Sequence, residues 1–459
     1  MKDFKRVYFV GGGGIGMAAL ERYFLSKGKA VAAYDRTPSE LTARLEEEGV
    51  IMSYADDPAA AVPEEFRDAA DTLVVFTPAV PADSAVMTFF REGGFKMIKR
   101  SEALGIVTSH SKALCFAGTH GKTTTSCMAA HVLHTCSCGC NAFLGGILRN
   151  YDSNLLLSPT SQWTVAEADE YDRSFHRLHP WIAVITATDP DHLDIYGTEE
   201  AYLESFAHFT ELIAPGGALV VHTGLKLVPR AGADVSVFTY SAAEGDFHAG
   251  NVRIADGRIT FDFVHPGGRI ADIELGVPVL INIENAVAAL AACWLTGELE
   301  PDAARRAMAS FMGSERRFQF LLKEPAGGHV VIDDYAHHPD ELRTSIASVR
   351  ALYPDRHITV AFQPHLYTRT RDFAPQFAEA LSAADAVVLT DLYPAREKPI
   401  EGVDSELILR QVRCDDKHLV AKDNLVDWLK NRNFDILLAC GAGDMSLLLP
   451  GLCEQIKQR

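Results

Sequence analysis

A lysine and a threonine follow a glycine-bearing turn in the chain, and these residue types could bind the phosphates of a nucleotide. The apolar run 113–117 predicts a buried strand, and residues 118–125 then read Gly-Thr-His-Gly-Lys-Thr-Thr-Thr before an apolar helical pattern. In such a P-loop, backbone N–H groups and the helix N-terminus receive the phosphates. Lys122 would reach the terminal phosphates, and the Thr123 hydroxyl would be a Mg²⁺ ligand. Phe116 stands where the common motif has glycine, and an ordinary strand-to-helix turn is the alternative.

Carboxylates gather after the next predicted strand, where a P-loop protein needs an acid to hold Mg²⁺. The strand 162–166 runs into Glu167-Ala168-Asp169-Glu170-Tyr171-Asp172. Carboxylates at the end of a buried strand are costly without a cation, so the pattern favours a metal site over a solvated acidic loop. A further strand, 181–186, is followed by Asp189-Pro190-Asp191-His192-Leu193-Asp194. His192 is therefore a second candidate metal ligand, with a purely structural histidine as the alternative.

A second glycine loop lies near the N-terminus. The run 6–10 leads into Gly11-Gly12-Gly13-Gly14-Ile15-Gly16, in which Gly11, Gly13 and Gly16 fit Gly-x-Gly-x-x-Gly. Glycine lets backbone N–H groups approach a diphosphate with no Cβ in the way. Asp35 follows the strand 30–34 and stands where a ribose-binding acid is expected. With further strands at 72–76 and 96–98, the pattern predicts a Rossmann-like domain; a plain tight turn is the alternative.

The last third of the chain again alternates strands and helices, which indicates another parallel α/β sheet. Strands are predicted at 330–332, 358–362, 386–389 and 436–439. Ligands bind at the carboxyl ends of such strands, and Arg369 and Arg371, which follow the second of them, suit a carboxylate or phosphate. Helix capping and surface arginines are the alternative. Before this region, Asp256-Gly257 between two β-rich runs predicts a hairpin.

Composition places these motifs in a globular protein. The 459 residues suggest about three domains. Hydrophobic residues make up 47%, which excludes a disordered chain. The 43 basic and 61 acidic residues give a net charge of −18, which argues against nucleic acid or an anionic membrane as a partner held by bulk charge. With no apolar run of ~18 residues and no secretory signal pattern, we expect a cytoplasmic protein.

Nine cysteines are scattered through the chain, which favours a reducing compartment over a disulfide framework. Cys136, Cys138 and Cys140, with His131 and His134 upstream, could bind a metal. However, the Cys-x-Cys-x-Cys spacing is tighter than that of usual zinc sites. We expect buried thiols at a helix end instead.

Together the motifs resemble the Mur ligases of peptidoglycan assembly, over essentially the whole chain. The resemblance rests on Gly-Gly-Ile-Gly-Met from Gly13, the P-loop from Gly118, Glu-Ala-Asp-Glu from Glu167, Asp191-His192, Arg316-Arg317-Phe318, Asp-Asp-Tyr-Ala-His-His-Pro from Asp333, and Phe-Gln-Pro-His-x-Tyr-Thr-Arg-Thr-Arg from Phe362. It implies three α/β domains: a Rossmann-like UDP-sugar domain at 1–106, a central P-loop ATPase domain with added β-strands at 107–315, and a Rossmann-like amino-acid domain at 316–459.

The reaction that this resemblance implies is an ATP-dependent ligation early in peptidoglycan biosynthesis. ATP would phosphorylate the carboxylate of UDP-N-acetylmuramate, and the amine of L-alanine would displace phosphate from the acyl phosphate. The motif from Phe362 favours L-alanine over the recycled murein tripeptide that a sibling ligase uses. A nicotinamide-dependent dehydrogenase, a P-loop kinase or switch, and a binding module are the alternatives from other classes. The resemblance implies ATP and Mg²⁺ as cofactors, no nucleic acid or membrane partner, and a monomer or weak homodimer.

The resemblance also implies roles for individual residues. Catalytic roles fall to Lys122, Glu167, His192, His338 and Arg371, and Mg²⁺ is expected at Thr123, Glu167 and His192. ATP is expected to contact Gly118, Thr119, His120, Gly121, Lys122, Thr123, Thr124, Asn285, Arg317 and Asp334. The UDP-sugar and the amino acid are expected at Gly11, Gly13, Gly14, Ile15, Gly16, Asp35, His337 and Arg369. Closure about a hinge near 313–317 would exclude water from the acyl phosphate.

Two positions depart from the family pattern. Ile281 precedes Asn282 where the family usually has His-Asn. Phe206 stands near the position at which several related ligases carry a carbamylated lysine, and residues 191–215 contain no lysine. We therefore expect the second Mg²⁺ to depend on Glu167, His192 and water.

Overall fold

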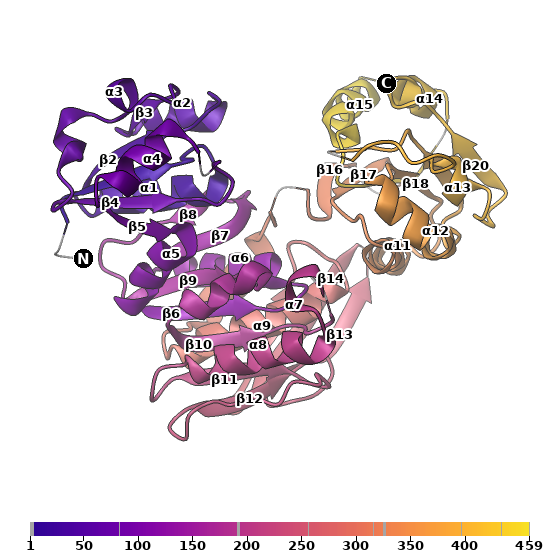
Figure 1. Cartoon of the computed structure of the whole chain (residues 1–459). Coiled ribbons are helices and arrows are strands. Elements are labelled where there is room, and N and C mark those ends of the chain that lie inside the picture. The colour runs from indigo at the N-terminus through magenta and orange to yellow at the C-terminus, as the bar shows by residue number, and fades with distance from the viewer. Residues whose placement is uncertain are drawn as a thin grey trace. The chain divides into compact units, whose positions relative to one another are not determined.

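The computed structural model describes residues 4–81, 83–190, 193–255, 257–314, 316–324, 327–395, 397–432 and 434–458, without the side chains of 193 and 194. These residues form three α/β sheets, of five, seven and six strands, and a separate three-stranded sheet (Figure 1). The prediction of α/β domains with parallel sheets is confirmed.

The first sheet is parallel throughout, with the strand order β3-β2-β1-β4-β5. The order reverses beside β1, so the glycine loop that follows β1 lies at a topological switch point, where α/β proteins bind ligands. The strands are β1 (Arg6–Val10), β2 (Ala30–Tyr34), β3 (Ile51–Ser53), β4 (Thr72–Phe76) and β5 (Lys96–Lys99). The helices are α1 (Ile15–Ser26), α2 (Glu40–Glu47), α3 (Pro58–Ala61), α4 (Ala85–Glu92) and α5 (Arg100–Ser109).

The second sheet has the order β12-β11-β10-β6-β9-β7-β8. Strand β6 (Lys112–Ala117) pairs in parallel with β9 (Trp163–Ala168) and with β10 (Pro180–Ile185), so the loops after these three strands meet at one sheet edge. The other strands are β7 (Asn141–Leu148), β8 (Ser153–Leu156), β11 (Ala218–His222) and β12 (Ser236–Tyr240). The helices are α6 (Lys122–Thr135), α7 (Leu193–Tyr196), α8 (Glu199–Glu211), α9 (Ile281–Leu295) and α10 (Pro301–Ser310), with a 3-10 turn at Tyr171–Arg177.

A continuous apolar core joins these first two sheets. The rings of Tyr23 on α1 and Phe143 on β7 pack edge to face with centroids 5.3 Å apart. The Asn154 amide on β8 donates a 3.0 Å hydrogen bond to the carbonyl of Ile15 at the start of α1. The N-terminal glycine loop is therefore fixed to the central sheet by both packing and a polar contact.

The third sheet has the order β16-β17-β21-β18-β19-β20, with only β16 antiparallel to its neighbour among the pairs described. Its strands are β16 (Gln319–Lys323), β17 (Val330–Asp334), β18 (Ile358–Phe362), β19 (Ala386–Leu389), β20 (Asp416–Leu419) and β21 (Ile436–Cys440). Its helices are α11 (Pro339–Leu352), α12 (Tyr367–Leu381), α13 (Glu406–Leu409), α14 (Leu425–Lys430) and α15 (Leu449–Lys457).

The chain divides into two compact units. The first comprises Met1–His248, Phe263–Arg269 and Asn285–Ala307, and the second comprises Ala249–Asp262, Ile270–Glu284 and Met308–Arg459. The three-stranded sheet consists of β13 (His248–Ala255), β14 (Arg258–His265) and β15 (Gly268–Glu274). The predicted hairpin is thus present around Gly257, while Asp256 lies outside the described residues. No helix in the described ranges is long and apolar enough to cross a membrane.

Candidate active site

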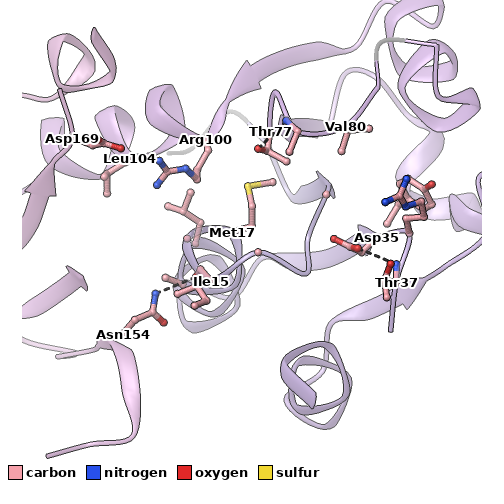
Figure 2. A pocket seen from close by; sticks show the side chains of 18 of the residues that line it. Ile15, Met17, Asp35, Thr37, Thr77, Val80, Arg100, Leu104, Asn154 and Asp169 are labelled. Atoms are coloured by element: carbon pink, nitrogen blue, oxygen red, sulfur yellow. Dashed lines mark hydrogen bonds between the residues drawn. The ribbon is translucent and has the colours of Figure 1, made fainter. Parts of the chain in front are cut away.

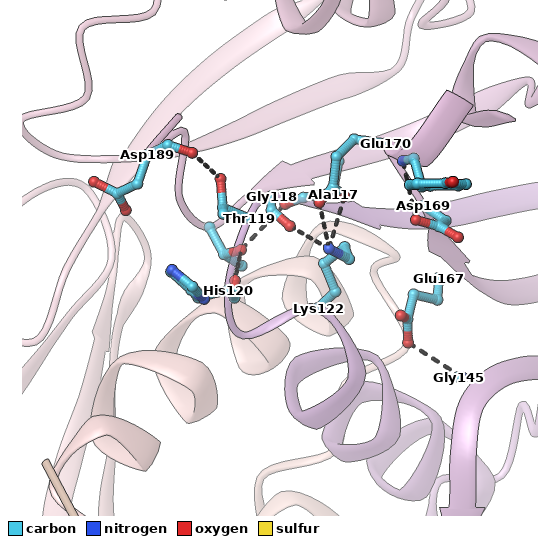
Figure 3. Close-up of polar contacts among 12 residues, drawn as sticks. Ala117, Gly118, Thr119, His120, Lys122, Gly145, Glu167, Asp169, Glu170 and Asp189 are labelled. Atoms are coloured by element: carbon cyan, nitrogen blue, oxygen red, sulfur yellow. Dashed lines mark hydrogen bonds and ion pairs between the residues drawn. The ribbon is translucent and has the colours of Figure 1, made fainter. Parts of the chain in front are cut away.

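The P-loop lies at the end of β6 and is held by its neighbours (Figure 3). Gly118 has φ +141°, and a Cβ there would lie 2.2 Å from the hydroxyl of Thr186, so only glycine fits. The Thr119 hydroxyl donates to the carbonyl of Asp189 at 2.7 Å, and Thr119 N–H bonds to the carbonyl of Ala187 at 3.1 Å. The loop is thereby tied to the end of β10 in a shape that requires its glycine.

Lys122, the first residue of α6, is fully engaged inside this loop. Its Nζ lies 2.9 Å from Oε1 and 2.7 Å from Oε2 of Glu170, and it donates to the carbonyl of Gly118 at 2.6 Å. The Lys122 side chain is only 14% exposed and that of Glu170 only 2%. Lys122 is thus paired with a buried carboxylate, and a phosphate that binds the loop would compete with Glu170 for its ammonium.

Glu167 stands on β9 beside the P-loop. Its Oε2 accepts a 3.2 Å hydrogen bond from Gly145 N–H, and its carboxyl also bonds to the Thr123 side chain. Burial raises the pKa of Glu167, against the opposing effect of the Lys122 charge. A half-buried carboxyl next to a hydroxyl is a donor set that a hard cation such as Mg²⁺ would stabilise. His192 and Asp191, the other predicted members of this site, lie outside the described residues.

Asn285 of α9 also reaches the P-loop. Its Oδ1 accepts a hydrogen bond from the Thr125 hydroxyl at 3.2 Å and lies 2.9 Å from the position of a Cβ at Gly121. Ile281, the first position that departs from the family pattern, begins α9 and is 45% exposed. Asn282 donates its amide to the carbonyl of Val277, and Phe206 is wholly buried among aromatic rings. Phe206 therefore offers no ligand to a metal.

The N-terminal glycine loop uses part of its backbone internally. The N–H groups of Gly11 and Gly12 both bond to the carbonyl of Tyr34, at 2.7 and 3.0 Å. Gly13 N–H donates to Oδ2 of Asp35 at 2.7 Å, so Asp35 braces the loop. Helix α1 begins just after Gly14, and the first N–H groups of a helix have no acceptor within it. These donors at the start of α1 are the ones left for a diphosphate.

A cavity of about 770 Å³ extends from this glycine loop to the acidic end of β9 (Figure 2). Its volume suits a ligand as large as a nucleotide sugar. Of the predicted substrate residues, those that line it are Gly11, Gly14, Ile15, Gly16 and Asp35, whereas Gly13 does not. Glu167 and Asp169 line its other end, so a ligand held by the glycine loop would reach the residues beside the P-loop.

In the second unit, a cluster of cationic and aromatic side chains follows β17 and β18. His337 Nδ1 lies 3.0 Å from the carbonyl of Tyr335, and burial lowers the pKa of His337. Its ring centroid is 6.2 Å from that of His365, whose Nδ1 is 3.5 Å from a guanidinium nitrogen of Arg369. Arg317 stacks over the Tyr335 ring at 5.4 Å. The structure thus brings together Arg317, His337 and Arg369 of the predicted residues.

Three other predicted residues have local roles in the structure. Asp334 is buried, where it accepts a 3.2 Å bond from Phe318 N–H and a short one from the Ser345 hydroxyl. His338 caps α11 by accepting from Asp340 N–H at 3.4 Å. The Arg371 side chain is 52% exposed and pairs with the adjacent Asp372. Their roles toward ATP and the amino acid stay predictions.

Asp333, at the end of β17, should make stability depend on pH. Burial raises the pKa of Asp333 to about 6, although Arg316, whose Nε is 3.9 Å away, opposes the shift. The unfolded chain has the ordinary value of ~3.9, so the folded state binds more protons between about pH 4 and 6, and stability falls as pH rises through that window. We expect Asp333→Asn to raise the free energy of unfolding by roughly 1–3 kcal/mol at pH 8 and by nothing at pH 4. Urea unfolding at both pH values tests this; an equal effect at both would contradict it.

Two of the three clustered cysteines are buried, as the sequence predicts, and Cys138 is half-buried. Cys136 and Cys140 are buried just beyond the end of α6, and burial raises the pKa of the Cys138 thiol to about 11. His131 bonds to the Tyr151 hydroxyl at 2.7 Å. In the described part of the chain, no three His, Cys, Asp or Glu side chains are grouped so that they could hold a metal ion.

Sequence reasoning missed two residues of the site. Glu170 is the counter-ion of Lys122, although the acidic run had suggested only metal binding for it. Arg100, the first residue of α5, lines the cavity beside the glycine loop, and no motif indicated it. Both contacts join segments far apart in the chain.

Comparisons with known proteins match the chain to one family along nearly its whole length. Residues 6–112 match the "Mur ligase family, catalytic domain", 116–293 the "Mur ligase middle domain" and 316–443 the "Mur ligase, glutamate ligase domain". The UDP-N-acetylmuramate–L-alanine ligase of Phocaeicola vulgatus is 55% identical over 460 residues, which cover 100% of both chains. That of Parabacteroides distasonis is 55% identical, with 98% of each chain covered.

Among solved structures, the UDP-N-acetylmuramate-alanine ligase of Thermotoga maritima is similar over 99% of both chains, with a TM-score of 0.78 and 25% identity. A murein peptide ligase of Psychrobacter arcticus shares the fold, with a TM-score of 0.60 and 19% identity over 99% of this chain and 98% of its own.

Proposed function

The chain belongs to the Mur ligase family, and we propose that it joins L-alanine to the carboxylate of UDP-N-acetylmuramate with the consumption of ATP. The cavity carries this proposal, because it joins the glycine loop of the first sheet to the residues beside the P-loop. The sugar nucleotide would bind with its diphosphate at the start of α1 and its carboxylate toward Glu167 and Asp169. The full-length identity to L-alanine ligases supports the choice of substrates.

The first chemical task is to make the carboxylate reactive. A carboxylate is a poor electrophile because its leaving group would be oxide, and transfer of the γ-phosphoryl group of ATP gives an acyl phosphate instead. Lys122 would move from Glu170 to the phosphates and stabilise the charge that develops on them. Thr123 and Glu167 would hold Mg²⁺, with His192 as a further candidate. When bound, Mg²⁺ neutralises charge on the phosphate oxygens.

The second task is to bring the amine to the acyl phosphate. Attack by the L-alanine nitrogen forms the amide bond and expels phosphate, and the gain comes chiefly from positioning. Arg369, beside His337 and His365, carries the positive charge that would bind the carboxylate of the amino acid. Because the reaction consumes ATP and a nucleotide sugar, we propose that the protein works in the cytoplasm.

Phosphate release measured with L-alanine and with a murein tripeptide as the amino substrate tests the proposal. We expect the purified protein to release phosphate from ATP when UDP-N-acetylmuramate and L-alanine are both present, and not when either is left out. Mass spectrometry should detect the UDP-N-acetylmuramoyl-alanine product. Release with a murein tripeptide but not with L-alanine would overturn the assignment in favour of the tripeptide-adding sibling. Hydride transfer without ATP consumption would reject the ligase activity.

A further inference from the structure

We propose that Arg100 binds an oxyanion of the sugar nucleotide, and that residue 16 is glycine because a side chain there would displace the guanidinium. This inference rests on the proposed function, since it concerns the same cavity. It adds a substrate-binding residue that the glycine motif alone does not indicate.

The geometry places the Arg100 side chain against the glycine loop. A Cβ on Gly16 would lie 2.9 Å from Nη1 of Arg100, 3.2 Å from its Cδ and 3.5 Å from its Cζ. Gly16 is the second residue of α1, and its φ is not positive, so the backbone itself would accept alanine. A side chain at residue 16 would therefore have to push the Arg100 guanidinium out of its present position.

The side chain is positioned but not neutralised. Arg100 is the first residue of α5, half-buried in the wall of the cavity, and Figure 2 shows it between Met17 and Asp169. Among the residues that the structure describes, it has no hydrogen-bond or ion-pair partner. A guanidinium carries donors in a fixed fork that matches a phosphate or carboxylate, and such a group in a cavity without a partner calls for an anion.

The charge of the cavity strengthens this argument. Its described lining has five carboxylates but only two cationic side chains, those of Arg36 and Arg100; the acids are Asp35, Asp56, Asp83, Glu167 and Asp169. A sugar nucleotide with a diphosphate and a carboxylate is itself strongly anionic. Arg36 adjoins Asp35 in sequence. Arg100 instead lies beside Gly16, at the start of α1, where the diphosphate is proposed to bind. Arg100 is thus the cation placed to offset repulsion between the ligand and the acidic wall.

Two oxyanions of the ligand could meet this guanidinium: the diphosphate, or the carboxylate that reacts. Three ligands separate them, namely UDP, UDP-N-acetylglucosamine and UDP-N-acetylmuramate, because only the last carries the carboxylate. Calorimetry on the full chain would measure the Kd of each for the wild type and for Arg100→Gln. We expect Kd to rise roughly tenfold to a hundredfold for the ligands that carry the recognised anion. Weaker binding of all three ligands would show that Arg100 contacts the diphosphate. Weaker binding of UDP-N-acetylmuramate alone would show that Arg100 contacts the carboxylate.

Gly16→Ala supplies the second arm. Gly16→Ala should raise the Kd of the same ligands. The double variant Gly16→Ala/Arg100→Gln should bind them no more weakly than the weaker-binding single variant, because both changes remove the same interaction. Arg44→Gln, a half-exposed arginine outside the cavity, is the matched control and should leave every Kd unchanged. Unaltered ligand binding by Arg100→Gln, or additive effects in the double variant, would overturn the inference.

The same experiment keeps this inference distinct from the proposed ligase activity. Phosphate release by the wild type, which depends on L-alanine, tests the activity without reference to Arg100. Wild-type turnover with unaltered binding by Arg100→Gln would reject only the role of Arg100. Weakened UDP binding by Arg100→Gln in a protein that adds no L-alanine would reject only the ligase assignment. The wild type and Arg100→Gln should bind ATP with the same Kd, because Arg100 is not part of the P-loop.

Discussion

Lys122→Ala is expected to lower the rate of alanine-dependent phosphate release by roughly 10²–10³-fold. Lys122 begins α6 in the P-loop, and in the proposed reaction it would stabilise the charge that develops on the transferred phosphoryl group. The effect should fall mainly on kcat, because the interaction is strongest in the transition state. Steady-state assays of phosphate release with saturating UDP-N-acetylmuramate and L-alanine measure it.

Because Lys122 is paired with Glu170, a second variant is needed to separate a loss of catalysis from a loss of stability. Removing Lys122 alone leaves a carboxylate that is only 2% exposed without its counter-ion, and such a loss can destabilise a protein by about 3–5 kcal/mol. Lys122→Met combined with Glu170→Gln removes both charges and retains similar volume. This double variant should fold with the thermal stability of the wild type and still lack turnover.

A matched lysine controls for the loss of a positive charge. Lys226 is in the same unit, is 75% exposed and pairs with Glu199 on the surface. Lys226→Ala should change turnover by less than about twofold, since surface ion pairs contribute little. Wild-type turnover in the folded Lys122→Met/Glu170→Gln protein would reject the catalytic role of Lys122.

The parts of this fold that the sequence predicted well are those with local signals. Strands β1, β2, β4, β18 and β19 have the bounds expected from their apolar runs, and the turns after β6 and β9 carry their motifs at the predicted places. Buried parallel strands read as short continuous apolar runs, and glycine and lysine mark the phosphate loop within a few residues.

Two of the strands that were missed, β20 and β7, lack such a signal. β20 reads Asp-Lys-His-Leu at the edge of its sheet, and β7 includes the pair Gly145-Gly146. An edge strand such as β20 is not covered on both sides, so charged residues are tolerated there, whereas β7 lies between β9 and β8 and its glycines weaken the strand pattern. The parallel pairing of β7 with β9 is non-local, and no short window of sequence reports it.

In the site, too, residues within a motif could be predicted from the sequence, whereas contacts between distant segments could not. The residue types of the P-loop and of the acidic run identified Lys122 and Glu167, whereas the Lys122–Glu170 pair joins residues 48 positions apart. Likewise, Arg100 meets the glycine loop only because α5 packs beside α1. His338 and Arg371 show the converse, since residue type alone did not reveal that one caps a helix and the other pairs with its neighbour.

Glu167→Gln is expected to lower turnover by roughly 10²–10³-fold and to raise the Mg²⁺ concentration needed for half-maximal rate. Glutamine keeps the shape that fits against Gly145, where a Cβ would lie 2.2 Å from the carboxyl oxygen, so the loss can be assigned to charge. Titration of phosphate release with Mg²⁺ at fixed ATP measures both quantities.

The stability of this variant separates a metal ligand from a structural acid. Burial raises the pKa of Glu167, which means that the folded protein without a cation disfavours the ionised carboxyl. A neutral amide at this position therefore should not lower the melting temperature measured without Mg²⁺, whereas Mg²⁺ with ATP should stabilise the wild type more than the variant. Asp172→Asn is the matched control, because Asp172 belongs to the same acidic run, is exposed, and has φ 48°, which asparagine tolerates. That control should keep wild-type turnover and Mg²⁺ dependence; if Glu167→Gln keeps them as well, the carboxylate has no role in holding the metal.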